Sequence, residues 1–98
     1  MLQKFSWRDE KNQRNIKKHK LELKAAITVF EDDNRLEMYD DSHSEQYEDR
    51  YITIGKDHRT NVLFVSYTMR DEENTIHLIS VRKAEPPEKR LYEQNLNW

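Results

Sequence analysis

Two long apolar segments separated by a short polar one place the strongest constraint on the fold of this chain. Residues 61–70 and 75–83 are rich in β-branched and aromatic residues, a composition that favours strands. The four polar residues between them have the length of a hairpin loop. An alternating segment, 51–56, precedes them and is followed by a second polar tetrad, 57–60. We therefore predict an antiparallel meander in the second half of the chain, with residues 36–39 as a further short strand.

The first thirty residues carry a helical pattern. Phe5 and Trp7 alternate with polar residues, which predicts a short edge strand before the helices. Asp9 can cap a polar helix over residues 10–19, with Ile16 as its apolar anchor. Residues 23–30 have apolar side chains at i, i+3, i+4 and i+7, the stripe of an amphipathic α-helix. This stripe consists of Leu23, Ala26, Ile27 and Phe30.

A third helix is predicted at the end of the sequence. Pro86 and Pro87 suit a first helical turn, and the residues that follow offer Leu91, Tyr92 and Leu96 for docking. A strand, two helices, a sheet and a last helix make an α+β fold. Since 98 residues suffice for one core, we expect residues 1–98 to form a single domain.

Charge is distributed unevenly, although the formal net charge is only -2. Residues 1–30 carry eight Lys or Arg against three Asp or Glu, and residues 31–50 carry two against nine. A polyanion responds to local potential rather than to net charge, so the basic segment is compatible with a nucleic-acid partner. The acidic segment would repel phosphate wherever it lies near the basic one. Its simpler interpretation is a solvated loop and an edge strand.

Several classes of protein are excluded by what the sequence lacks. There is no cysteine, which rules out a disulfide framework and a thiolate metal site. No apolar run approaches the roughly 18 residues of a membrane-spanning helix, and the N-terminus lacks the apolar core of a signal peptide. We therefore expect a cytoplasmic protein with no cofactor and no membrane partner.

Four short blocks of residues follow one another between residues 7 and 92. The first is Trp7, Asp9, Lys11, Asn15, Lys18 and His19, leading into Ala25, Ala26 and Phe30. The second is His43, Ser44 and Glu45, with residues 48–51, Ile54 and Gly55. The third is Tyr67, Thr68 and Arg70, and the fourth is residues 79–84 with Glu88 and Tyr92. Each block alone is weak, but in this order they resemble the BrnT family of ribonuclease toxins.

The resemblance implies a compact RelE-like fold, with two N-terminal helices on a mainly antiparallel sheet of three to five strands and a C-terminal helix. It implies a metal-independent endoribonuclease toxin that inhibits translation and is neutralised by a cognate BrnA-type antitoxin. The two would form a hetero-oligomer that contacts DNA only through the antitoxin. Lys20, His77 and Val81 depart from the family pattern, in which Gly, Arg and Ala are common. His77 matters most if it contacts RNA, because histidine is largely neutral at pH 7.

Such cleavage needs a base for the 2′-OH, an acid for the leaving 5′ oxygen, and cations for the transition state. Arg82 is the favoured cation because it ends an apolar strand at the rim of the sheet, with an ion pair to Glu88 as the alternative. Arg70 ends the neighbouring strand, where it could equally be solvated, and Arg50 could pair with Glu48 or Asp49. The further candidates for binding RNA are Lys11, Lys18, Lys83 and Tyr51. Lys11 and Lys18 share a helix face that is either a phosphate rail or ordinary solvent surface.

His19, His43 and Tyr67 are the candidates for proton transfer. His19 ends the first helix, where the helix dipole raises the pKa of an imidazole and capping is the alternative role. The carboxylates around His43 favour its protonated form, which suits a general acid, although a solvated loop histidine is the simpler interpretation. Tyr67 has the flat face that stacks on bases, and it could equally be a core residue.

The predicted sheet has one apolar and one polar face. The apolar face, under the helices, would carry Ile52, Ile54, Leu63, Val65, Tyr67, Ile79 and Val81. The polar face, toward RNA, would carry Tyr51, Thr53, Ser66, Thr68, Arg70, Ser80 and Arg82. A simple four-residue loop at 71–74 would pair Val65 with Ser80 and break this scheme, so a bulge or a longer loop is required.

Other functions fit the sequence less well. A non-catalytic RNA-binding or antitoxin-binding module of the same fold is the main alternative, favoured by the acidic segment and His77. A DNA-binding regulator is a weaker alternative, because the sequence shows no helix-turn-helix spacing. His43 and Ser44, which are adjacent in one loop, cannot assemble a hydrolase triad. The acidic residues around His43 lack a metal-ligand spacing.

Overall fold

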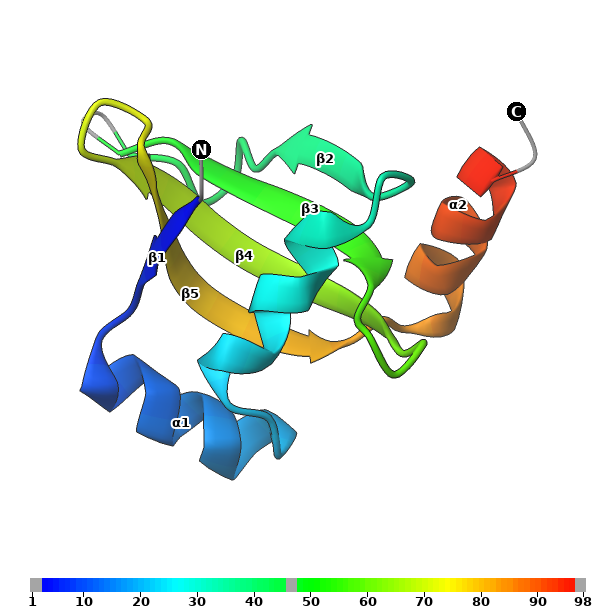
Figure 1. The fold of residues 1–98 in the computed structure, drawn as a ribbon, viewed down its shortest axis with the longest axis horizontal. Coiled ribbons are helices and arrows are strands. Elements are labelled where there is room, and N and C mark those ends of the chain that lie inside the picture. Colours follow the sequence, from blue (N-terminus) through cyan, green and yellow to red (C-terminus); the bar gives the residue numbers. More distant parts are fainter. Residues whose placement is uncertain (1–2, 46–47, 97–98) are drawn as a thin grey trace.

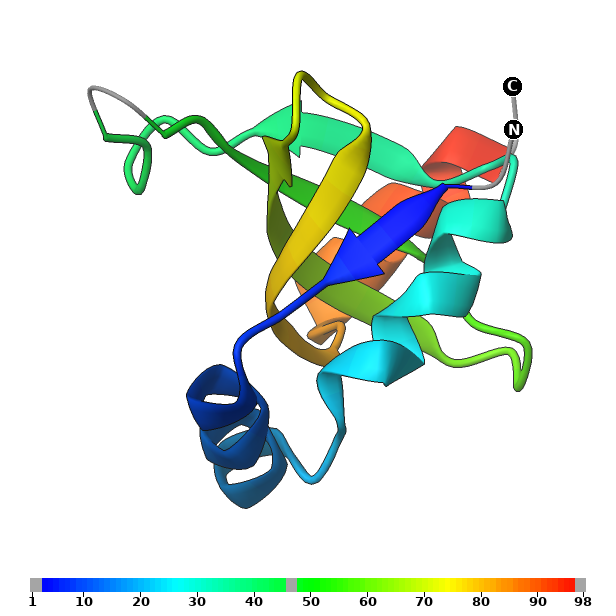
Figure 2. The same cartoon turned by 60° about the vertical axis from the view of Figure 1, so that its left-hand side comes forward.

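The computed structural model describes residues 3–45 and 48–96, which contain a five-stranded sheet in the order β1-β5-β4-β3-β2. Strands β2 (Leu36–Tyr39), β3 (Arg50–Lys56), β4 (Val62–Arg70) and β5 (Thr75–Lys83) form the predicted antiparallel meander. Strand β1 (Lys4–Ser6) runs parallel to β5 at the sheet edge, as Figure 2 shows. The predicted α+β class is confirmed.

Three helices complete the fold. Helix α1 (Asp9–His19) lies along β5, and the helix η1 (Leu23–Glu31) crosses the front of the sheet in Figure 1. Helix α2 (Pro86–Leu96) ends the described chain and lies at the right-hand end of the same view. The two N-terminal helices and the C-terminal helix were predicted, and their positions show that the sheet is covered unequally on its two faces.

The helix η1 is a 3-10 helix rather than the predicted α-helix. Its hydrogen bonds span three residues, as between the Asp32 N–H and the Val29 carbonyl. A turn of three residues stacks every third side chain on one line. The fully buried side chains are accordingly Leu23, Ala26 and Val29. Ile27 and Phe30 of the predicted stripe are only partly buried at its sides.

Two apolar cores lie on opposite faces of the sheet. The larger, under η1, consists of Leu23, Ala26, Val29, Leu63, Val65, Tyr67, Ile76, Leu78 and Val81. The smaller joins Ile54 and Val62 to Tyr92 of α2, whose hydroxyl donates to Asp32 at 2.6 Å. The predicted docking of Leu91 and Leu96 is wrong, because they are 45% and 39% exposed. Tyr92 therefore supplies most of the anchoring of α2.

A β-bulge in β5 decides which side chains share a face. Val65 pairs with Val81 and Ser66 with Ser80, but Tyr67 pairs with Leu78. Ile79 is thus an extra residue without a partner of its own, which shifts the alternation of β5 by one. This is the irregularity that the predicted faces required, and the pairing of Ser80 confirms those faces for β4 and for residues 80–82 of β5.

The predicted faces are wrong for β3. Thr53 pairs with Val65 and Ile54 with Phe64, so Thr53 lies under η1 while Ile52 and Ile54 lie on the opposite face. Thr53 can be fully buried there because its hydroxyl is hydrogen-bonded as both donor and acceptor. Alternation predicts that the two isoleucines share a face. It does not predict which of two cores they enter.

One side chain of α1 closes the open edge of β5. The Asn15 amide donates to the Val81 carbonyl at 2.8 Å and accepts from the Val81 N–H at 3.0 Å, and a third bond joins it to the turn after α1. Asn15 is 4% exposed, so it anchors α1 in place of the predicted Ile16. The predicted cap is also wrong, because Asp9 is already the first residue of α1.

Candidate nucleic-acid interface

Arginines from three neighbouring strands share the sheet face opposite η1. Arg50 of β3 pairs with Thr68, and Arg82 of β5 pairs with Phe64. Arg70 lies two residues beyond Thr68 on β4 and therefore points to the same face. A hollow of about 400 Å³ on this face is lined by Asp40, Ser42, His43, Arg50, Ile52, Phe64, Ser66, Ile79, Ser80 and Arg82. Three predicted site residues, His43, Arg50 and Arg82, thus meet in one hollow.

Arg82 is held in a bidentate ion pair. Its two terminal nitrogens lie 2.7 and 2.8 Å from the Glu88 carboxylate, and its guanidinium lies 4.0 Å from the centre of the Phe64 ring. The same carboxylate accepts the Glu85 N–H at 2.8 Å and so caps α2. The hydrogen bond raises the pKa of Arg82 and lowers that of Glu88. The ion pair considered as the alternative for Arg82 is therefore present, at the border of the hollow.

Arg50 and Arg70 share a single carboxylate. The distances are 3.8 Å from Arg50 Nε to Glu48 Oε1 and 3.7 Å from Arg70 Nη2 to Glu48 Oε2, longer than hydrogen bonds. Among the residues that the structure describes, the buried Arg50 Nε has no hydrogen-bond partner. A buried donor without an acceptor costs free energy. One carboxylate between two guanidinium groups also leaves a positive charge, so a phosphate oxygen would satisfy both.

The two candidate histidines differ in their surroundings. His43 lines the hollow, with its side chain 67% exposed and Nδ1 2.9 Å from Asp40 Oδ2. Burial, followed by the charges of Lys18 and Arg82, lowers the pKa of His19. The raised pKa predicted from the helix dipole is therefore wrong for His19, because burial and two nearby cations lower the pKa. The same effect shows that His19 lies close to the arginine face.

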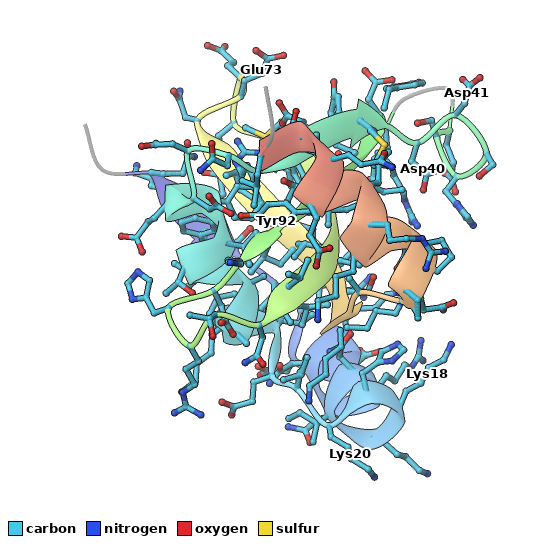
Figure 3. All side chains as sticks on the ribbon, turned by 90° about the vertical axis from the view of Figure 1, so that its right-hand side faces the viewer. Lys18, Lys20, Asp40, Asp41, Glu73 and Tyr92 are labelled. Carbon is cyan, nitrogen blue, oxygen red and sulfur yellow. The ribbon has the colours of Figure 1, made fainter. Side chains whose placement is uncertain are left out.

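The predicted lysines are less enclosed than the arginines. Lys18 is exposed and projects from the end of α1 at the lower right of Figure 3, whereas Asp40 and Asp41 lie at the upper right. Lys83 at the end of β5 is also exposed, and Lys11 in α1 is half-buried. These side chains could meet a polymer that extends beyond the hollow, but they do not line it.

Tyr67 and Tyr51 lie on the η1 face, away from the arginines. They pair across β4 and β3 with ring centres 5.7 Å apart. Tyr67 is 1% exposed and its hydroxyl donates to Glu37. Burial and this bond raise the pKa of Tyr67. A ring enclosed in this way has no free face for a base, so Tyr67 takes the core position that was its alternative.

The acidic segment is more than a solvated loop. Asp40 lines the hollow, and Glu48 lies between the two arginines. On the other side of the sheet, a hollow of about 480 Å³ is lined by Glu37, Met38, Tyr39, Tyr51, Met69 and Glu73. The carboxylates on the arginine face thus lie beside Arg50 and Arg70 and in the hollow, where they would oppose the binding of phosphate.

His77 belongs to this face, although the sequence did not place it there. Its Nδ1 lies 2.8 Å from Ser6 Oγ of β1, and the residue is 7% exposed. Burial, followed by the charges of Arg70 and Arg8, lowers its pKa. Strict alternation would have put His77 and Arg82 on opposite faces. Only its departure from the family pattern marked this position in the sequence.

Metal clusters and membrane-spanning helices are both missing from residues 3–45 and 48–96. No three His, Asp or Glu side chains in these ranges gather closely enough to hold a metal ion. None of the helices described there is long and apolar enough to cross a membrane.

Fold and site together define a small α+β protein in which the helix η1 covers one sheet face, while three arginines and helix α2 share the other. The family model described as "Ribonuclease toxin, BrnT, of type II toxin-antitoxin system" matches residues 7–88. The chain belongs to this family, which confirms the resemblance seen in the four sequence blocks.

Comparison with solved structures supports the same fold. The crystal structure of the ribonuclease toxin BrnT of Brucella abortus aligns with a TM-score of 0.65 and 20% sequence identity, covering 86% of this chain and 99% of that one. No curated protein matched the sequence. At this level of identity the likeness establishes the fold, and the chemistry must be argued from the residues of this chain.

Proposed function

We propose that this chain is a metal-independent endoribonuclease toxin that cleaves RNA by attack of a 2′-OH on the neighbouring phosphate, and so inhibits translation in the cytoplasm. The products would be a 2′,3′-cyclic phosphate and a free 5′-OH. The observation that carries the proposal is the gathering of Arg50, Arg70 and Arg82, from three strands, around one face with an open hollow. Arginine suits the transition state because its planar fork grips phosphate and stays charged.

The existing ion pairs suggest how phosphate would enter. The two contacts of Glu48 are 3.7 and 3.8 Å long, so they give up little when a phosphate oxygen takes their place. Arg50 Nε, which has no hydrogen-bond partner within residues 3–45 and 48–96, offers a donor for that oxygen. Arg82 would either release Glu88 and bind the phosphate, or keep its ion pair and provide a second, fixed positive charge beside the phosphate.

The proton-transfer groups would come from the histidines at this face. His43 lines the hollow, with Nδ1 2.9 Å from Asp40 Oδ2, and is the candidate acid. His19 has a lowered pKa and is therefore neutral at pH 7, which suits a base. Lys11, Lys18 and Lys83 would hold flanking phosphates, and their contribution would weaken as salt is raised.

The first test is RNA cleavage by the purified chain in EDTA, with the new 3′ ends analysed for cyclic phosphate. Arg50→Gln and Arg82→Gln should each lower the rate by about 100-fold or more, the usual effect of losing one transition-state donor. Arg59→Gln, which removes the same charge from the exposed loop after β3, is the matched control. Folded variants that both retain full activity would remove the arginine face from the mechanism.

A second outcome has a specific basis, because each arginine of the face already has a carboxylate nearby. If the chain binds a 2′-deoxy oligonucleotide but leaves RNA intact, it is a non-catalytic binding module of the same fold. Filter binding and cleavage measured on the same preparations distinguish the two functions.

We also propose that a cognate BrnA-type antitoxin binds and neutralises the chain, in a hetero-oligomer that reaches DNA only through the antitoxin. The proposal is supported by membership of a toxin–antitoxin family. Expression of the chain should stop bacterial growth, and co-expression of the neighbouring gene should restore it. Growth arrest that the neighbouring gene does not relieve would refute the pairing.

A further inference from the structure

The bulge at Ile79 brings a histidine onto the arginine face. His77 pairs with Thr68 and Ser80 pairs with Ser66, and both partners lie on the arginine side of β4. Without the extra residue, positions 77 and 80 would point to opposite faces. Bulges commonly re-aim side chains at functional sites, and this one adds a titratable ring to a face that already holds phosphate-binding groups.

The ring of His77 is fixed in orientation. Nδ1 lies 2.8 Å from Ser6 Oγ, which β1 positions by pairing in parallel with β5. Nε2 makes no hydrogen bond within residues 3–45 and 48–96. It is also not one of the buried side-chain atoms that lack a partner in this part of the chain, so it is not fully enclosed. Within these ranges one nitrogen is therefore held by the protein, while the other has no partner and could accept a hydrogen bond from a ligand. When Nδ1–H donates to Ser6, Nε2 carries the free lone pair of a base.

Charged groups from several elements surround this ring. Arg70 of β4 and Arg8 of the segment after β1 lower the pKa of His77, after the larger effect of burial, and Glu48 before β3 opposes them. The ring is consequently neutral at pH 7, the state that a general base requires. Arg70 beside it can hold the phosphate whose neighbouring 2′-OH must lose a proton.

We infer that His77 is the catalytic base of the proposed ribonuclease reaction, with Ser6 as its positioning residue; this inference rests on the proposed function. Nε2 takes the proton of the 2′-OH while the 2′ oxygen forms a bond to phosphorus. The P–O5′ bond breaks, and the 5′ oxygen leaves with the bonding pair and is protonated from solvent. His77 then returns its proton to water. His77 thus takes the role of base in place of His19, and His19 and His43 are left as groups that bind the substrate.

The experiment is a single-turnover cleavage assay of the full chain over the pH range of about 4.5 to 8. The wild-type rate should rise with pH and level off at an apparent pKa below the ordinary histidine value of about 6.5. His77→Gln can keep the hydrogen bond to Ser6. It should lower the single-turnover rate constant at least about 100-fold, abolish the rise of this rate with pH and leave RNA binding unchanged. Ser6→Ala should shift the apparent pKa of the rate and lower the rate by a smaller factor. His58→Gln, in an exposed loop, is the matched control.

A second measurement applies even if the His77 variant does not fold. The His77 ring proton in the wild-type NMR spectrum should shift saturably when an uncleavable 2′-deoxy oligonucleotide is added, while that of His58 stays in place. The inference is overturned if the wild type is active but the rate of His77→Gln still rises with pH in the same way. It is also overturned if the His77 resonance does not move. In either case the proposed function still stands. A wild type that cleaves no RNA would overturn the proposed function and this inference with it.

Discussion

Replacing Asn15 by alanine should cost more stability than any surface change on α1. The substitution removes two buried hydrogen bonds, of 2.8 and 3.0 Å, to the carbonyl and N–H of Val81 and a third to the turn after α1. Each buried backbone group left without a partner costs about 1–3 kcal/mol. The two groups of Val81 alone give a loss of about 2–6 kcal/mol, a large part of the roughly 5–15 kcal/mol that stabilises a small domain.

Urea unfolding followed by far-ultraviolet circular dichroism measures this loss. With an m-value of about 1–3 kcal/mol/M, a loss near 3 kcal/mol should lower the midpoint by about 1–3 M. Amide exchange at Val81 should accelerate by more than at its neighbours in β5. The matched control is Gln13→Ala, on the exposed side of the same helix, which should change stability by less than about 0.5 kcal/mol.

The isosteric variant Asn15→Asp tests the same reasoning without opening a cavity. It keeps the acceptor for the Val81 N–H but turns the donor into an oxygen facing two carbonyls, so it should be at least as destabilising as alanine. If Asn15→Ala and Gln13→Ala proved equally stable, water would be replacing the amide without penalty, and the argument that one side chain closes the β5 edge would fail.

Further predictions concern the close packing at Gly55 and the ion pair of Arg82. A Cβ at Gly55 would lie 2.8 Å from Arg35 Cβ, so Gly55→Ala should cost about 1–3 kcal/mol and lower Tm by roughly 4–8 °C per kcal/mol; an unchanged Tm would contradict this contact. Glu88→Gln should cost about 1 kcal/mol at pH 7, since its partly exposed ion pair is screened by solvent. Because Arg82 lowers the pKa of Glu88, this contribution is present above the unfolded value of about 4.3 and is lost as the pH falls through the folded value. The difference in stability between the wild type and Glu88→Gln should therefore vanish in acid, and a difference that persisted at low pH would refute the ion-pair origin.

The sequence predicted the elements of the fold better than their packing. Polar tetrads and apolar runs located β3, β4 and β5 to within one residue, because local composition decides where a strand stops. The 3-10 geometry of η1 was not predicted, because α and 3-10 helices share the same local apolar residues and the sheet beneath selects the period. The role of Asn15 was also missed, since its partner Val81 is 66 residues away.

The candidate site was predicted in part for the same reason. Residues at strand ends, such as Arg82 and Arg70, can be recognised from alternation, whereas Tyr67 has no local signal that separates a core ring from an exposed one. His77 was left out because the bulge that turns it toward Arg82 has no signature in the sequence. The required irregularity could be deduced, but its position could not.

What the sequence alone determined is the list of strands and helices, the family and the presence of arginines at strand ends, because each depends on neighbouring residues. What only the tertiary structure decided is which side chains face one another. Long-range pairing set the side of β3, the bulge at Ile79 and the contact of Glu48 with Arg70. These depend on the register between strands, which is settled when both sheet faces are packed at once, and a register shift of one residue moves every side chain of a strand to the other face.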